Sequence, residues 1–220
     1  SVDFYINFET LTVSDNNEEF SINVFFNPVW SGQHQARLLI DEVSDSLGQH
    51  FEILLTGNVL DGTEVSGVVS GTWTQEGSPY LVTDNISVSP YTNLTIDSGV
   101  EVIFMDNYMI EINGDLSVNG TTEDSIYFRS SVPENTWQGI HFSYTTDVSN
   151  LSFINISNTN DKAISSYYSQ GITISDATIH DFSGRAIYSD DTFSTFSLIN
   201  SNIYDGSNEG YISFTDTYVI

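Results

Sequence analysis

Four aspartates near the C-terminal end of the sequence are the side chains best suited to hold a metal ion. Carboxylate oxygens are the ligands that Ca²⁺ prefers, and several must converge on one ion. The sequence contains neither an EF-hand loop nor a glycine-rich nonapeptide repeat. We therefore predict a calcium site only if the fold brings the four carboxylates together, with a solvated acidic edge as the alternative. The residues are Asp181, Asp190, Asp191 and Asp205.

No group of residues in the sequence matches a catalytic centre. The four histidines are scattered, at His34, His50, His141 and His180. There is no Ser-His-Asp spacing, phosphate-binding loop or HExxH string. Glycoside hydrolases use two carboxylates at a defined separation, and no acidic pair here lies in such a motif. We predict no catalytic residue in this chain.

Tyrosines near the end of the sequence form the second candidate site. Exposed aromatic side chains can stack on sugar rings or dock a partner protein, because they combine apolar area with a polar edge. Tyr188, Tyr204 and Tyr211 are predicted to form such a surface. The alternative is that packing in the core and at turns accounts for them.

The charge of the chain excludes two classes of partner. Thirty acidic residues face four basic ones, for a formal net charge of -26. Such a surface repels nucleic-acid phosphates and anionic lipids, so we expect neither nucleic acid nor a membrane as a direct partner. It suits a medium in which salt or divalent ions screen the repulsion. The basic residues are Arg37, Arg129, Lys162 and Arg185.

Other bulk features concern location. The sequence has no cysteine, which excludes disulfides and thiolate metal sites, and no apolar run long enough to span a membrane. The first residues resemble the middle of a strand, and the last are apolar, although a solenoid needs its ends covered. We expect a fragment of a longer exported protein, located outside the cell or on a bacterial cell surface.

The elements that position these residues follow from a repeat between residues 151 and 212. Ile156, Ile179 and Ile203 are separated by about 23 and 24 residues. A fixed period of this size, built from short β-type strings, is typical of a solenoid whose repeats bury their inner faces by stacking. Polar residues at equivalent turns are predicted either to form a ladder or to act as independent turn residues. They are Asn158, Asp181 and Asp205.

Residues 1–60 follow a different pattern. Apolar residues alternate with polar ones in four runs, at about 2–8, 20–26, 36–40 and 51–55. Strands of this length with frequent turn signals predict part of a β-sandwich. The polar, glycine-containing residues 61–70 are predicted to link it to the solenoid at 71–220.

The first region resembles the C-terminal part of an immunoglobulin-like module. FSINVFFNP at 20–28, ARLLI at 36–40 and FEILLTG at 51–57 are similar to modules of the ASPM, SPD-2 and hydin type. The segment 41–49 is longer than the turn usual in that family. The resemblance implies an incomplete immunoglobulin-like β-sandwich.

The second region resembles the right-handed parallel β-helix domains of secreted bacterial surface proteins. GTWT at 71–74, SPYLV at 78–82 and LTIDSGVEVIF at 94–104 carry the resemblance. It implies an all-β, right-handed solenoid. Lyases of this fold use an arginine or lysine beside acidic residues, so Arg185 is the candidate if the chain is a carbohydrate-active enzyme.

Together these patterns predict a structural or adhesive rod in a large, modular, exported protein. Its partner would be another surface protein, a component of a secretion machinery, or a glycan. Two alternatives are kept. One is a polysaccharide lyase or hydrolase with its site near Arg185 or outside this chain. The other is a filament subunit or secretion-system cargo, recognised by addition of a strand at an open sheet edge.

Overall fold

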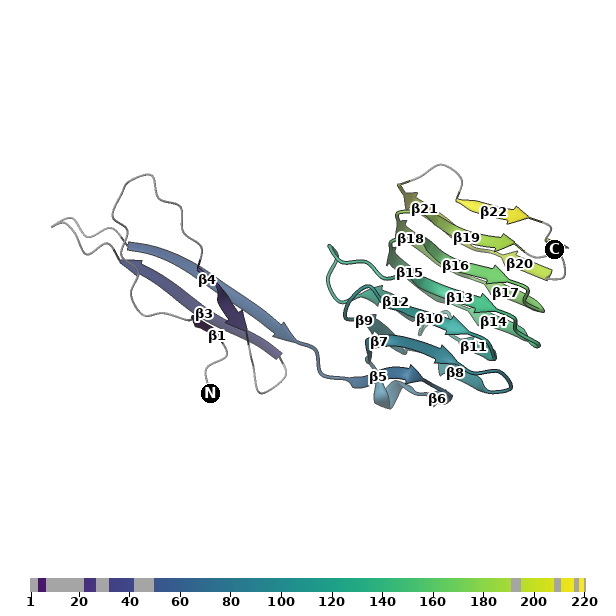
Figure 1. Cartoon of the computed structure of the whole chain (residues 1–220), viewed down its shortest axis with the longest axis horizontal. Coiled ribbons are helices and arrows are strands. Elements are labelled where there is room, and N and C mark those ends of the chain that lie inside the picture. Colours follow the sequence, from purple (N-terminus) through teal and green to yellow (C-terminus); the bar gives the residue numbers. More distant parts are fainter. Residues whose placement is uncertain are drawn as a thin grey trace. The chain divides into compact units, whose positions relative to one another are not determined.

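The computed structural model describes residues 4–6, 22–26, 32–41, 50–190, 195–207, 211–215 and 218–219. The described chain is all-β apart from one 3-10 turn, η1 (Gln75–Gly77) (Figure 1). It divides into two compact units, Ser1–Asp61 and Gly62–Ile220. Each unit is described by itself.

The described strands of the first unit form two antiparallel pairs. β1 (Phe4–Ile6) pairs with β2 (Val24–Phe26), and β3 (Gly32–Asp41) pairs with β4 (His50–Val59). The centroid of the Phe26 ring lies 4.7 Å from that of Phe4 and 5.7 Å from that of His34. Each of the four strands overlaps one of the four alternating runs of the sequence. A complete immunoglobulin-like sandwich is not shown by the residues described in this unit.

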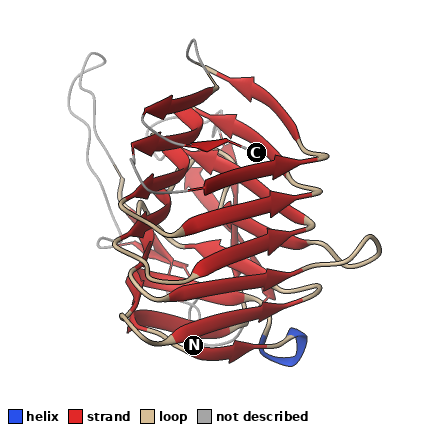
Figure 2. Ribbon diagram, turned by 90° about the vertical axis from the view of Figure 1, so that its right-hand side faces the viewer, coloured by secondary structure: helices blue, strands red, loops and turns tan. Residues whose placement is uncertain are grey.

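The second unit is a parallel β-solenoid, as the repeat predicted. Each coil adds one strand to each of three faces, and equivalent strands of successive coils pair in parallel (Figures 1 and 2). The first face contains β9 (Glu101–Phe104), β12 (Ile126–Ser130), β15 (Ile154–Thr159), β18 (Thr178–Phe182) and β21 (Asn202–Gly206). The second face contains β10 (Met109–Ile112), β13 (Gly139–Ser143), β16 (Lys162–Tyr167), β19 (Arg185–Asp190) and β22 (Ile212–Thr215).

The third face is a separate 7-stranded sheet. It contains β6 (Gly71–Trp73), β8 (Asn93–Asp97), β11 (Asp115–Asn119), β14 (Val148–Ser152), β17 (Gly171–Ser175), β20 (Thr195–Ile199) and β23 (Tyr218–Val219). The first two faces share one 12-stranded sheet, because β7 (Tyr80–Val88) pairs with β9 through its first part and with β10 through its second.

The solenoid begins earlier than the sequence suggested. Residues 61–70 were expected to be a linker, but β5 (Thr63–Val68) lies within them and pairs in parallel with β7. Most of β5 is exposed, so it lacks the apolar alternation of a strand packed on the core. A polar sequence does not distinguish such a strand from a linker, since its backbone supplies the pairing.

Three corners connect the faces. The first corner leads from the first face to the second, the second corner from the second to the third, and the third corner on to the next coil. The fully described connections run from one residue, Phe153, to the eight residues 131–138. Short corners keep successive coils in register, because the chain between strands has little freedom to vary.

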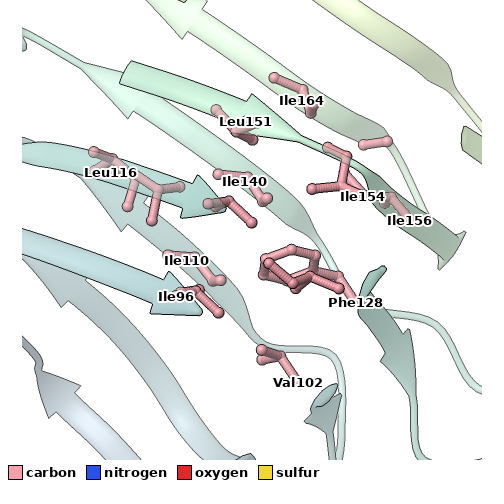
Figure 3. Close-up of a cluster of buried hydrophobic side chains, with 14 of the residues drawn as sticks. Ile96, Val102, Ile110, Leu116, Phe128, Ile140, Leu151, Ile154, Ile156 and Ile164 are labelled. Carbon is pink, nitrogen blue, oxygen red and sulfur yellow. The ribbon is translucent and has the colours of Figure 1, made fainter. Parts of the chain in front are cut away.

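The core consists of columns of inward-facing apolar side chains, one from each coil (Figure 3). Val102, Phe128, Ile156 and Ile179 are aligned on the first face and are fully buried. Fully burying such a side chain stabilises a fold by about 1.5–3 kcal/mol. Each coil is therefore stabilised by the coils above and below it.

Candidate functional site

The predicted polar ladder lies next to the first corner. The parallel register of the residues on either side places Asn158, Asp181 and Asp205 at equivalent positions of successive coils. All three adopt left-handed backbone conformations, with φ of 61°, 52° and 53°. Asn and Asp tolerate this region better than other residues with a Cβ, which explains their recurrence here. The alignment of the ladder is confirmed.

Two of the three ladder side chains have partners outside the ladder. Asn158 Nδ2 donates to Pro133 O at 3.1 Å. Asp181 Oδ2 lies 2.7 Å from His180 Nδ1. The ladder thus reflects a shared backbone conformation, and its carboxylates do not converge on a common point through their hydrogen bonds.

The predicted calcium residues lie at different corners. Asp181 and Asp205 are beside the first corner, whereas Asp190 ends β19 at the second. A strand of six residues separates the two corners, which corresponds to about 16 Å at 3.3 Å per residue. Asp191 lies outside the described residues. Within the described ranges, no three His, Cys, Asp or Glu side chains form a group that could hold a metal ion.

The three predicted tyrosines also lie in different places. Tyr188 is on the second face, Tyr204 is on the first, and Tyr211 precedes β22 at the first corner. Each has its own ring neighbour: Tyr167 for Tyr188 at 5.7 Å, His180 for Tyr204 at 5.2 Å and Phe182 for Tyr211 at 5.1 Å. Tyr204 and Tyr211 are exposed, as predicted, at 45% and 39%, but the three tyrosines belong to separate sites and do not form one surface.

Arg185 lies in a cationic and aromatic cluster on the second face. It is aligned with Lys162 of the preceding coil, and both approach the Tyr188 ring, at 5.6 Å and 5.4 Å from its centroid. Lys162 Nζ also pairs with Asp161 Oδ2 at 2.5 Å. Cation–π contacts of this kind stabilise partly exposed side chains by about 0.5–1 kcal/mol.

The ring of Tyr188 lies beneath the cationic groups of Lys162 and Arg185. Its hydroxyl donates to Asp190 Oδ2 at 3.3 Å. Burial, followed by the nearby Asp190 carboxylate, raises the pKa of Tyr188 above its usual 10.0. The phenol is therefore neutral at physiological pH and serves as a hydrogen-bond donor and a packing surface.

The second face also assembles a serine–histidine pair that was not predicted from the sequence. Ser165 Oγ lies 2.9 Å from His141 Nδ1, and His141 Nε2 lies 2.8 Å from the Gln138 carbonyl oxygen. The carbonyl can only accept, so Nε2 carries a proton, and in neutral His141 the other nitrogen accepts from the serine hydroxyl. A nucleophile and base require this geometry. Ser165 is completely buried, however, so no substrate can reach its oxygen.

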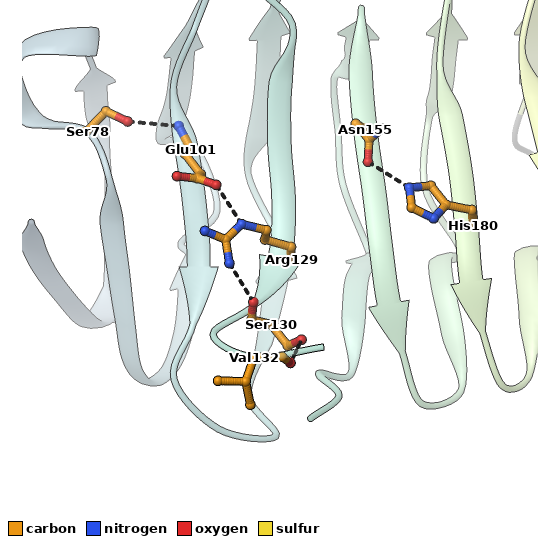
Figure 4. A network of polar contacts seen from close by, with 7 residues as sticks. All are labelled: Ser78, Glu101, Arg129, Ser130, Val132, Asn155 and His180. Atoms are coloured by element: carbon orange, nitrogen blue, oxygen red, sulfur yellow. Dashed lines mark hydrogen bonds and ion pairs between the residues drawn. The ribbon is translucent and has the colours of Figure 1, made fainter. Parts of the chain in front are cut away.

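A second histidine is held on the first face (Figure 4). His180 Nε2 lies 3.2 Å from Asn155 Oδ1, and its ring stacks on Tyr204 with an interplanar angle of 4°. Both neighbours lie one coil from His180 along the solenoid. The period of the repeat was the signal that could have found this cluster and the Ser165–His141 pair.

Arg129, the third basic residue of the solenoid, is also engaged on the first face (Figure 4). Its Nε atom lies 2.5 Å from Glu101 Oε1, and its Nη1 donates to the Ser130 carbonyl at 3.0 Å. Glu101 is fixed in turn, because its backbone N–H donates to Ser78 Oγ at 2.9 Å. This network joins neighbouring coils and leaves Arg129 in a structural role.

The second corner carries exposed tyrosines that were not predicted from the sequence. Tyr144 and Tyr168 follow strands of successive coils, and their rings stack at 5.5 Å with an interplanar angle of 8°. Tyr91 lies at the same corner two coils earlier. The two stacked tyrosines are again separated by one coil in the sequence.

Known proteins offer no comparison for these sites. No helix in the described parts of the chain is long and apolar enough to cross a membrane. No protein-family model, curated protein or solved structure matches the chain.

Proposed function

We propose that the chain is a structural or adhesive rod segment of a large, exported, modular bacterial surface protein. The observation that carries the proposal is the parallel pairing of equivalent strands from coil to coil, which makes a stiff scaffold with a repeated outer surface. Short corners leave the outer faces open to a partner. We further propose that the solenoid is right-handed, as its resemblance implies, and that the first unit belongs to an immunoglobulin-like module.

The acidity of the chain supports a location outside the cell or on its surface. A net charge of -26 keeps such rods from associating with one another and with anionic lipids. The partner is then another surface or secretion-machinery protein, or a glycan without a high negative charge.

Retention and cleavage can be measured on the same surface. Beads carrying the full chain are applied to glycan-coated and protein-coated surfaces, and soluble sugars are quantified. A rod or adhesin retains the beads on at least one surface and releases no sugar. Sugar release that maps to residues 71–220 contradicts the proposal, and so does the absence of retention on every surface.

The Lys162–Arg185–Tyr188 cluster favours one alternative, a carbohydrate-active enzyme. Two cations and a ring on adjacent coils could hold an anionic sugar, since guanidinium and ammonium groups pair with carboxylates. If the chain cleaves a polysaccharide at this cluster, Arg185→Ala abolishes turnover. Unchanged turnover in that variant removes the assignment to Arg185.

A further inference from the structure

The second corner carries the three most exposed tyrosines whose side chains are described. Tyr91, Tyr144 and Tyr168 are 89%, 69% and 56% exposed. Tyr144 and Tyr168 are aligned by the pairing of β13 with β16, so their stacked rings follow the axis of the solenoid. The corner between Tyr91 and Tyr144 is the tight connection Asn113–Gly114.

All three tyrosines occupy left-handed backbone conformations, with φ of 63°, 55° and 50°. At Tyr91 the chain makes a turn in which the Thr92 N–H donates to the Ser89 carbonyl at 3.1 Å. A positive φ at the third residue of such a turn favours Gly or Asn. Bulky residues are rare in this region because their Cβ crowds the following carbonyl.

The first corner shows how this backbone requirement is met without cost. Asn158, Asp181 and Asp205 fill the equivalent conformation beside the first corner. At the second corner, tyrosines adopt the same conformation, yet their rings are mostly in solvent and cover little of the core. Residues held in an unfavourable backbone conformation cluster at functional sites. These tyrosines bury little side-chain surface that would offset the strain. The exposed rings are therefore suited to contact a ligand.

The charge around the second corner indicates which kind of ligand the tyrosine rings bind. Tyr168 follows the last residue of β16, whereas Lys162 is the first, so the cations lie at the far end of the strand. Acidic residues occupy positions beside the tyrosines instead: Asp190 is aligned with Tyr167, and Asp147 is in the same connection as Tyr144. Aromatic faces and carboxylates both attract cations.

The acidity of this corner is also visible at Asp115, which opens β11 directly after Asn113–Gly114. Burial, followed by repulsion from Asp147, raises the pKa of Asp115. A cation bound near this corner would be attracted by the same carboxylates.

We propose that the second-corner tyrosines Tyr91, Tyr144 and Tyr168 bind a basic, arginine- or lysine-containing segment of a partner protein. Its side chains lie over the tyrosine rings, and the surrounding carboxylates attract it at longer range. The proposal rests on the proposed function, because it names the partner class of an adhesive rod.

The test uses the full chain and a short synthetic peptide of alternating arginine and glycine. Binding is measured by calorimetry at two salt concentrations for the wild type and for the double variant Tyr144→Asn/Tyr168→Asn. Asn tolerates the left-handed conformation, so this variant keeps its fold, which the melting temperature checks. Loss of two exposed cation–π contacts weakens binding by about tenfold.

Matched variants distinguish peptide binding by the tyrosine rings from attraction of the peptide to the net charge of the protein. Tyr127→Asn removes an exposed tyrosine from the first face and leaves affinity within about twofold of wild type. Tyr144→Phe/Tyr168→Phe keeps both rings and retains binding. Should the Asn double variant fail to fold, Tyr144→Phe/Tyr168→Phe and peptide competition by free arginine still test the contact.

Three results would overturn this inference. They are equal peptide binding by the wild type and a folded Asn double variant, loss of binding in the Phe double variant, and tyrosine-dependent binding of a neutral hexasaccharide in place of the peptide. None of them contradicts the rod itself. The rod proposal fails on a different readout, which is sugar release or the absence of retention in the bead experiment.

Discussion

The first and second corners use aromatic residues in opposite ways. At the first corner, Trp137 points inward: it is fully buried, stacks on Phe104 with centroids 3.9 Å apart, and donates from Nε1 to the Ser157 carbonyl at 2.7 Å. At the second corner, Tyr144 and Tyr168 point outward into solvent. Trp137 closes the core at its corner, whereas Tyr144 and Tyr168 present stacked rings to the outside.

The two corners also fill the same backbone conformation with different residues. Asp181 and Asn158 suit a positive φ, whereas Tyr144 and Tyr168 do not. Residue choice at the first corner therefore suits the backbone of the coil. At the second corner it places large rings at the surface, in a backbone conformation that disfavours them.

Truncation of Trp137 gives the largest expected effect. Trp137→Ala empties a fully enclosed space and removes the hydrogen bond to Ser157, so we expect the free energy of unfolding to fall by about 3–5 kcal/mol. Urea denaturation measures the change. Tyr144→Ala, at the second corner, is the matched control and should cost less than about 1 kcal/mol. Equal costs at the two corners would remove the contrast between them.

A transfer of tyrosine to the first corner gives the next largest effect. In Asp181→Tyr a bulky side chain occupies φ of 52°, and the contact with His180 Nδ1 is lost. We expect a destabilisation of about 1–2 kcal/mol. Asp181→Asn keeps a residue suited to the conformation and should remain near wild type. If both variants unfold at the same urea concentration, backbone preference does not govern this corner.

The solenoid could be predicted from the sequence because its signal is local and periodic. Ile156, Ile179 and Ile203 pair one above another, as their spacing indicated. Each coil repeats the same apolar positions, so a short window already contains the pattern of the core. The strand β5 was missed because its side chains are mostly exposed and only its backbone pairs.

The candidate sites were harder to predict because neighbours in a solenoid are one coil apart. His180 and Tyr204 are 24 residues apart in sequence and stack, whereas Tyr188 and Tyr204 are closer in sequence and lie on different faces. Ser165 and His141 are also separated by 24 residues. A search for reactive residues near one another in sequence therefore selects residues on different faces. Residues one period apart lie about 4.8 Å apart between strands.

The converse substitution at the second corner gives a smaller effect. Tyr168→Asn loses the exposed ring stack with Tyr144 and gains a residue suited to φ of 50°. These terms oppose each other, so stability should stay within about 0.5 kcal/mol of wild type or rise slightly. The measurement is a urea titration beside Asp181→Tyr. A loss as large as that of Asp181→Tyr would show that the tyrosine stabilises its corner, contrary to the comparison.

The smallest effect concerns the pH dependence of the second corner. Burial and Asp147 raise the pKa of Asp115 above 3.8 in the folded chain, so the fold favours its protonated form. Its stabilising contribution is complete below the unfolded pKa and is lost as pH rises through the folded pKa. Asp115→Asn imitates the neutral form and should raise the melting temperature at pH about 7, with the gain shrinking towards zero near pH 4.

The control for Asp115 is Glu123→Gln, which removes one charge from an exposed connection at the third corner. If Asp115→Asn raises the melting temperature by the same amount as the control at every pH, only the net charge of the chain affects stability. A gain confined to pH above the folded pKa of Asp115 places the repulsion at the second corner. That result would show that repulsion between Asp115 and Asp147, beside Tyr144, lowers the stability of the chain. A bound cationic partner would relieve this repulsion.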